Sequence, residues 1–280
     1  MLLGGTVVAQ NPGVNGWEDA LIRSRFKTIT APFHCEMSRD LIENYCDIIH
    51  RHHVSIAEIG IWRNPMDPNP EKAREVLNYS KRQLKLADEL KIPCCVNIVG
   101  TSGSSGWDAA DSENFTQETY QRIIRLIQEI IDDVNPVHTF YCIEPMPWMI
   151  PDSPDSYLQL IHDVNRRAFA VHMDFVNMIN CPRRYLAAEQ FIEECFAKLG
   201  RWIKSTHIKD TKMHPTRLTT ILEECSPGEG SLNWANVLRI LDKYLPQNAP
   251  ILLEHMQTFD EYAAAYQYVS QKALEAGIPL

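Results

Sequence analysis

Four polar residues close four consecutive apolar segments of this 280-residue chain, and their chemical types suit a metal ion. Each segment is short and rich in β-branched or aromatic residues, so each is predicted to be a buried strand. An unpaired carboxylate in such a place costs several kcal/mol or takes up a proton. A shared cation would neutralise several carboxylates together, so the pattern predicts a metal site. Its ligands are Glu144, Asp174, His207 and Glu254.

Three carboxylates and one imidazole form a fairly hard ligand set. One divalent ion is therefore expected. Mn²⁺ is the first choice, with Mg²⁺, Co²⁺ and Zn²⁺ as alternatives; zinc would be favoured more firmly if the ligand set included a thiolate, which it does not. The first ligand, Glu144, is followed by Pro145 and Pro147, which turn the chain away from the strand and keep the end of the sheet open.

The elements that must position these ligands alternate along the chain. Short apolar segments are separated by longer segments with apolar residues at three- and four-residue steps, which is typical of strands and amphipathic helices in turn. Helix starts are indicated by Ser38 as an N-cap and by Pro70 in a first turn. The strands are predicted at 2–10, 27–33, 56–62, 93–100, 138–144, 168–174, 202–209 and 250–256. The helices are predicted within 38–53, 70–90, 116–134, 153–164, 187–200, 233–245 and 261–277.

Eight strand–helix units in this length predict an α/β fold, a single (β/α)8 TIM barrel that forms one domain over residues 1–280. The rival is an open doubly wound sheet, and its usual GxGxxG sequence after an early strand is absent. In a barrel the ends of the strands meet at one mouth, where catalytic groups sit. The four ligands would therefore converge near the barrel axis.

The composition narrows the class of function. A formal net charge of −9 disfavours nucleic-acid partners, and no apolar segment is long enough to span a membrane. The first residues, "MLLGGTVVAQNPG", lack the basic start of a signal peptide, so a cytoplasmic location is expected. The eight cysteines have no CxxC spacing, which favours reduced thiols.

Five stretches of the chain stand out: "IEPMPW", "VHMDFVNM", "STHIKD", "PGEGSLNW" and "LLEHM". They resemble the xylose isomerase-like barrels, a superfamily of sugar phosphate isomerases and epimerases, ketose 3-epimerases and endonuclease IV. The resemblance covers most of the chain and implies the same four metal ligands. In the ketose 3-epimerase branch two glutamates transfer protons, which implies that Glu144 and Glu254 are catalytic.

The chain departs from the epimerases at two places. They carry a histidine three residues after the metal-binding aspartate, where this chain has Asn177, and Lys209 follows the metal histidine here. Another candidate is His34, as a second general base or a substrate contact. His172 shares the strand face of Asp174 and is expected to support the site. The polar loop 100–115 is interpreted as a lid or a surface loop. Substrate contacts are predicted at Trp62, Arg63, Asn97, Trp148, Asn177 and Lys209.

The leading hypothesis is a metal-dependent enzyme, an isomerase or epimerase, that removes a proton beside the carbonyl of a ketose or oxo-sugar. The alternative is a lyase that resembles the α-subunits of bacterial C-glycoside deglycosidases, which cleave a 3-oxo-glycoside with help from a small β-subunit. An endonuclease IV-like nuclease and a non-catalytic barrel are disfavoured by the negative charge and by the intact ligand set. The resemblance leaves a homo-oligomer open.

Overall fold

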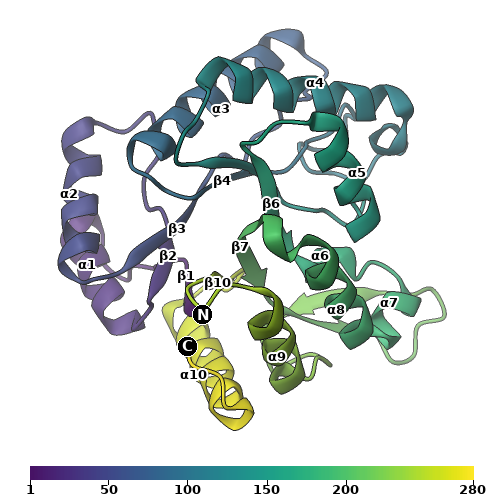
Figure 1. Cartoon of the computed structure of the whole chain (residues 1–280). Helices are drawn as coiled ribbons and strands as arrows, with labels where there is room; N and C mark the ends of the chain where they lie inside the picture. The colour runs from purple at the N-terminus through teal and green to yellow at the C-terminus, as the bar shows by residue number, and fades with distance from the viewer.

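Eight parallel strands close into a barrel in the computed structural model, which describes residues 1–280 (Figure 1). Around the barrel the strands follow the order β1-β10-β7-β6-β5-β4-β3-β2, and β1 pairs with β2 to close it. The barrel and its alternating helices confirm the predicted fold. The strands are β1 (Leu2–Gly5), β2 (Thr28–Thr30), β3 (Ser55–Gly60), β4 (Cys94–Asn97), β5 (Phe140–Ile143), β6 (Phe169–Asp174), β7 (Ile203–Ile208) and β10 (Pro250–Leu253).

The strands are apolar because both of their faces are covered. Side chains fill the inside of the barrel, and helices cover the outside, as the ring of helices in Figure 1 shows. All six residues of β6 are buried, including its two polar residues, His172 and Asp174. Polar residues in such strands need partners within the protein.

The covering helices begin where the sequence offers caps. Side chains of Ser38, Asn69, Thr116 and Thr258 accept hydrogen bonds from backbone N–H groups in the first turns of their helices. These helices are α1 (Gly13–Ser24), α2 (Arg39–Arg51), α3 (Pro70–Glu89), α4 (Gln117–Val134), α5 (Pro154–Val164), α8 (Ala188–Leu199), α9 (Trp234–Tyr244) and α10 (Phe259–Ala276). Shorter helices are η1 (Ser112–Phe115), α6 (Phe175–Met178), α7 (Pro182–Leu186) and η2 (Gly200–Trp202).

Helix α1 was not predicted from the sequence. It contains two glycines, Gly13 and Gly16, which weaken a helical pattern, and it has no side-chain cap at Pro12. Trp17 and Leu21 bury one face of this helix, and the edge of Trp17 packs on the ring of Tyr45, with centroids 5.0 Å apart. Tertiary packing therefore stabilises this helix, although its local sequence does not favour one.

A small antiparallel hairpin, β8 (Asp210–Met213) with β9 (Leu222–Cys225), follows β7 and was also not predicted. Buried Asp210 ties it to the barrel. One of its carboxylate oxygens accepts from the backbone N–H of Leu232, and the other accepts from Nε1 of Trp234 at 2.8 Å. The hairpin stands beside the barrel mouth and adds residues to it.

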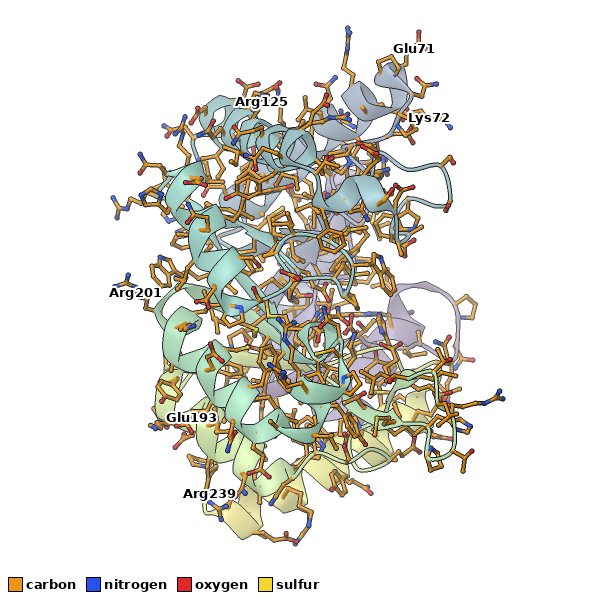
Figure 2. The ribbon with its side chains drawn as sticks, turned by 90° about the vertical axis from the view of Figure 1, so that its right-hand side faces the viewer. Glu71, Lys72, Arg125, Glu193, Arg201 and Arg239 are labelled. Carbon is orange, nitrogen blue, oxygen red and sulfur yellow. The ribbon has the colours of Figure 1, made fainter.

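Charged side chains project outward from the helices, as Glu71, Arg125, Glu193 and Arg239 do in Figure 2. The N-terminal nitrogen lies 3.1 Å from the carbonyl oxygen of Pro279, so the two ends of the chain meet. All eight cysteines are free thiols. None of the helices combines the length and apolarity needed to cross a membrane.

Candidate metal centre

The four predicted ligands converge at one end of the barrel. Glu144, Asp174, His207 and Glu254 each offer a ligand atom, and these atoms all lie within 4.8 Å of one another. The register of the strands explains this arrangement, because Asp174 pairs with His207 across β6 and β7, and the other two ligands directly follow β5 and β10. Nδ1 of His207 is 3.0 Å from Oε1 of Glu254 and 3.5 Å from Oε1 of Glu144.

The orientation of the His207 ring depends on a residue that the sequence did not single out. Glu58, in the middle of β3, is fully buried, and its Oε1 lies 2.9 Å from Nε2 of His207. Its Oε2 lies 2.9 Å from Nε2 of His172 and also accepts a hydrogen bond from Ser205. Burial alone would raise the pKa of Glu58, but the two histidines outweigh it and hold that pKa well below its usual range.

Lys209 supplies a positive charge inside the cluster. Its Nζ lies 2.8 Å from Oδ2 of Asp174, 3.0 Å from Oε2 of Glu254 and 3.1 Å from Oε2 of Glu224. Burial would lower the pKa of Lys209, but these carboxylates outweigh it and raise that pKa well above its usual value. The lysine therefore stays protonated and holds the carboxylates together.

The carboxylates differ in how well they are compensated. Burial raises the pKa of Asp174 to about 7, because Lys209 offsets only part of the burial and of the repulsion from Glu254 and Glu144. The pKa of Glu254 is held well below its usual range, because His207 and Lys209 outweigh the effect of burial. The neighbours of these two carboxylates therefore shift their pKa values in opposite directions.

The residues fit a divalent cation. Two buried ligand atoms, Nδ1 of His207 and Oδ2 of Asp174, have no hydrogen-bond partner in the protein; the contact of Lys209 with Asp174 is an ion pair outside hydrogen-bonding geometry. Nδ1 of His207 faces two carboxylate oxygens, so without a cation it must carry a proton itself. Three carboxylates and one imidazole are a donor set for Mn²⁺, Mg²⁺, Co²⁺ or Zn²⁺.

The rim carries a second pair of titratable groups. Nδ1 of His255 lies 3.0 Å from both carboxylate oxygens of Glu224, on β9, and its Nε2 lies 3.0 Å from Oε1 of Glu254. Hydrogen bonds from the His255 ring to these two glutamates raise the pKa of His255 to about 10, and the contact with His255 lowers the pKa of Glu224 to about 2. His255 has a left-handed φ of 62°, a conformation that tertiary contacts must maintain.

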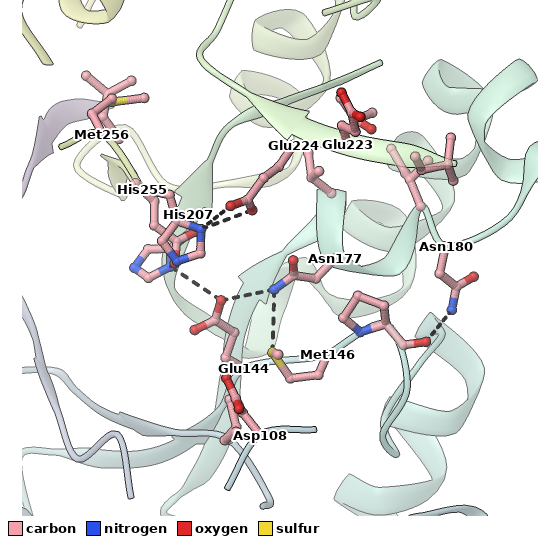
Figure 3. A pocket seen from close by; sticks show the side chains of 18 of the residues that line it. Asp108, Glu144, Met146, Asn177, Asn180, His207, Glu223, Glu224, His255 and Met256 are labelled. Atoms are coloured by element: carbon pink, nitrogen blue, oxygen red, sulfur yellow. Dashed lines mark hydrogen bonds and ion pairs between the residues drawn. The ribbon is translucent and has the colours of Figure 1, made fainter. Parts of the chain in front are cut away.

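The cluster opens into a cavity of about 990 Å³ at the barrel mouth, part of which Figure 3 shows. Three tryptophans line it: Trp62, Trp107 and Trp148. Trp62 also has a left-handed φ, 48°, and its ring centroid is 6.4 Å from that of His207. The cavity contains no lysine or arginine among its lining residues, whereas six are acidic: Glu58, Asp108, Glu144, Glu223, Glu224 and Glu254.

Three of the predicted substrate contacts line this cavity: Trp62, Trp148 and Asn177. Nδ2 of Asn177 donates to Oε1 of Glu144 at 3.3 Å, as the dashed line in Figure 3 shows. Trp148 donates from Nε1 to the backbone oxygen of Asp108 at 2.7 Å, so part of the loop 100–115 is attached to the mouth and forms one wall.

The other predicted contacts, Arg63, Asn97 and Lys209, are not among the residues that line the cavity. Asn97 is buried and bonds the backbone of Arg63 through both ends of its amide, while the Arg63 guanidinium lies over the Tyr79 ring and on Glu36. Lys209 is buried beneath the cluster. His34 does not line the cavity either, and its Nδ1 accepts from the backbone N–H of Glu36.

Several residues of the mouth were missed from the sequence: Glu58, Trp107, Glu224 and His255. A signal existed for Glu58, a lone charge in the apolar segment "SIAEIG", and for His255, which directly follows the predicted ligand Glu254. Glu224 gave no such signal, because it reaches the site only through the hairpin. His172, expected to support the site, lies beside it: its Nε2 contacts Glu58 and its Nδ1 lies 4.0 Å from Oε2 of Glu144.

The comparisons with known proteins agree with this architecture. The model of a family described as xylose isomerase-like TIM barrel matches residues 9–270. A search of curated proteins finds no match. Among solved structures, the chain is similar to a xylose isomerase-like TIM barrel protein from Mycobacterium smegmatis in complex with magnesium. The identity is 16%, the TM-score is 0.69, and the match covers 97% of this chain and 94% of that one.

Two further structures share the fold. One is a D-psicose 3-epimerase in the presence of D-fructose, with 13% identity, a TM-score of 0.73, and coverage of 99% of this chain and 100% of that one. The other is a 3-keto-D-glucoside 4-epimerase from E. coli in its apo form, with 13% identity, a TM-score of 0.69, and coverage of 96% of this chain and 98% of that one.

Proposed function

The chain belongs to the xylose isomerase-like TIM-barrel family, and from this premise we propose that it is a divalent-metal-dependent enzyme that removes a proton beside a sugar carbonyl. The observation that carries the proposal is the convergence of Glu144, Asp174, His207 and Glu254 within 4.8 Å at the base of a cavity. The ketose and ketoglucoside epimerases among its structural relatives support the same class of reaction.

The roles of the residues follow from their contacts. When held by the four ligands, a divalent ion supplies a Lewis acid for the carbonyl oxygen of the substrate. Glu144 and Glu254 accept and return the proton, because both are carboxylates that reach the cavity. Asn177 orients Glu144 by donating to its Oε1, and Lys209 holds Oε2 of Glu254. Trp62 offers an aromatic face to a sugar ring.

The substrate is proposed to be a sugar without phosphate groups. Phosphate binding uses arginine, lysine or helix N-termini, and the cavity is lined by six acidic residues and by neither basic type. The same acidic lining would repel the phosphates of a nucleic acid, which argues against a nuclease.

The lyase alternative is favoured by the size and lining of the cavity. A volume of about 990 Å³ lies at the upper end of the range for ligand pockets, about 300–1,000 Å³. Three tryptophans line it, which suits an aromatic group attached to the sugar. A glycoside with an oxo group on its sugar ring would fill this space better than a free ketose.

The test measures exchange of the C–H hydrogen beside the carbonyl with D₂O, by NMR, in protein supplied with Mn²⁺. A neutral ketose, its phosphate ester and a 3-oxo-C-glycoside are compared. Exchange into a neutral substrate and none into the phosphate ester is expected. Epimerisation without cleavage identifies an epimerase, and release of the aglycone identifies the lyase. No reaction with either neutral substrate would refute the proposal.

Replacing Glu144 by Gln keeps the shape of the side chain but removes the proton acceptor. Turnover should fall by about 10²–10⁴-fold, the usual contribution of a general base. A matched control is Glu71→Gln, at an exposed glutamate in the first turn of α3 (Figure 2), which should retain activity. Full activity of Glu144→Gln would remove this residue from the chemistry.

A further inference from the structure

Glu58 is a buried carboxylate with three hydrogen-bond donors and no proposed part in the reaction. The donors are Nε2 of His207 at 2.9 Å, Nε2 of His172 at 2.9 Å and the hydroxyl of Ser205. We propose that Glu58 is a positioning residue that keeps the ring proton of His207 on Nε2, and thereby presents Nδ1 as the ligand atom. The inference rests on the proposed metal-binding role of His207.

A second ion among Glu58, His172 and His207 does not fit these contacts. Both carboxylate oxygens of Glu58 already accept hydrogen bonds, so neither is left without a partner for an ion to satisfy. The two Nε2–Oε contacts here are both 2.9 Å, the usual length of a direct hydrogen bond. Glu58 therefore acts through the rings and touches no ion itself.

The chemistry of a carboxylate determines the tautomer. An ionised carboxylate only accepts hydrogen bonds, so each Nε2 that contacts Glu58 must carry a proton. When the ring is neutral or binds a metal ion, Nδ1 of His207 is then the nitrogen with the free lone pair, and it faces Oε1 of Glu144 and Oε1 of Glu254. A carboxylate behind a ligating imidazole fixes the tautomer and orientation of the ring in this way.

The surroundings keep Glu58 in this position. The rings of His172 and His207 meet edge to face, with centroids 4.1 Å apart and an interplanar angle of 82°. Rotation of the Glu58 carboxylate would break three hydrogen bonds in a fully buried place, which is costly. The histidine pair and the glutamate therefore constrain one another.

Glu58→Gln separates this role from simple packing. The glutamine amide has one accepting oxygen and one donating NH₂ group. Its oxygen should stay on the side of His172 and Ser205, where it accepts from two donors, so the NH₂ group should face His207. The neutral ring of His207 must then accept through Nε2 and carry its proton on Nδ1. That tautomer must move its proton back to Nε2 before Nδ1 can bind the ion, which lowers the affinity.

The experiment records two-bond ¹H–¹⁵N spectra of protein labelled with ¹⁵N-histidine, without metal at a pH where the ring is neutral, and again with Zn²⁺. Titration calorimetry measures the Zn²⁺ affinity. We expect the wild-type Nε2 of His207 to be protonated in both forms. In Glu58→Gln the metal-free ring should switch to Nδ1–H, and the affinity should fall by about 10–100-fold.

Ser205→Ala is the matched control, since it removes one hydrogen bond to Glu58 and leaves both histidine contacts. It should keep the Nε2–H form of His207 and change the affinity by less than about threefold. An unchanged tautomer in Glu58→Gln, or equal losses of affinity in both variants, would overturn the inference.

The wild-type spectrum tests the inference even if Glu58→Gln fails to fold. A wild-type His207 ring with its proton on Nδ1 and none on Nε2 would contradict the inference directly. The result is also separable from the proposed function. A wild-type protein that binds no divalent ion refutes the proposed metal enzyme, while the position of the ring proton still tests Glu58.

Discussion

Replacing Lys209 by Met tests whether a buried ammonium group holds the cluster of carboxylates together. The lysine Nζ lies within 3.1 Å of oxygens from Asp174, Glu254 and Glu224, and the residue is buried. Methionine has a similar unbranched stem, so the change removes the charge with little loss of packing volume. The variant should therefore report on electrostatics more than on a cavity.

The expected loss of unfolding free energy is about 3–5 kcal/mol, the usual cost of removing one partner from a buried ion pair. The loss should depend on pH because Asp174 titrates. Its pKa in the folded protein, raised to about 7, lies above its ordinary value. Its stabilising contribution is therefore present at low pH and is lost as the pH rises through about 7. Lys209 limits this loss, so the variant should suffer more at pH 8 than at pH 6.

Urea unfolding in EDTA, at both pH values, measures the loss by linear extrapolation. Lys243→Met is the matched control. Its Nζ lies 2.6 Å from Oε1 of Glu193, but the two side chains are 58% and 46% exposed. Such a surface pair contributes about 0–1 kcal/mol, so this control should change little. Mn²⁺ should reduce the difference in unfolding free energy between Lys209→Met and the wild type, because the bound ion replaces part of the positive charge that the variant lacks.

Equal losses for Lys209→Met and Lys243→Met would refute this reasoning, because it requires the buried ammonium to matter more than the exposed one. A Lys209→Met protein as stable as the wild type at pH 8 in EDTA would show that the carboxylates need no resident cation. A larger loss at pH 6 than at pH 8 would contradict the role given to Asp174.

Two other predictions concern the metal and the substrate. Burial lowers the pKa of His207, but Glu254, Glu58 and Glu144 outweigh it and raise that pKa well above its usual value. The ring is therefore charged at neutral pH without metal, and metal binding should release a proton and tighten as the pH rises; calorimetry in two buffers of different ionisation enthalpy checks this. Trp62→Ala should raise KM for the neutral sugar about two- to tenfold with a smaller change in kcat, because aromatic contacts contribute about 0.5–1.5 kcal/mol; steady-state kinetics with Trp62→Phe as the conservative control checks it.

The barrel could be predicted from the sequence because its strands are buried on both faces and read as apolar segments. The predicted segments contain all eight barrel strands apart from the first residue of β3, Ser55. Helix α1 and the hairpin β8–β9 were not predicted because tertiary contacts, and not their local sequence, stabilise them. The first depends on the packing of Trp17 and Leu21, and the second on the bonds that Asp210 accepts. Tertiary contacts of this kind leave little trace in local periodicity.

The convergence of the four candidate ligands could be predicted for a related reason. The carboxyl ends of the parallel strands all lie at one mouth of the barrel, so a polar residue at a strand end can be placed at that mouth from the sequence. The same argument does not say which way a side chain turns after the strand. Asn97 ends β4, yet its amide is used by the backbone of Arg63, and His34 caps its own turn at Glu36. Local hydrogen bonds decided these positions.

The contacts of the two glutamates also distinguish their parts in the proposed reaction. Glu254 has Lys209 at 3.0 Å from Oε2, with His207 and His255 each 3.0 Å from Oε1. Glu144 has Asn177 at 3.3 Å and His207 at 3.5 Å from Oε1, with no lysine or arginine in contact. A carboxylate surrounded by cations is a weak base, because protonation would forfeit those attractions. Glu144 has fewer cationic neighbours, so in the proposed reaction we assign the first proton removal to it.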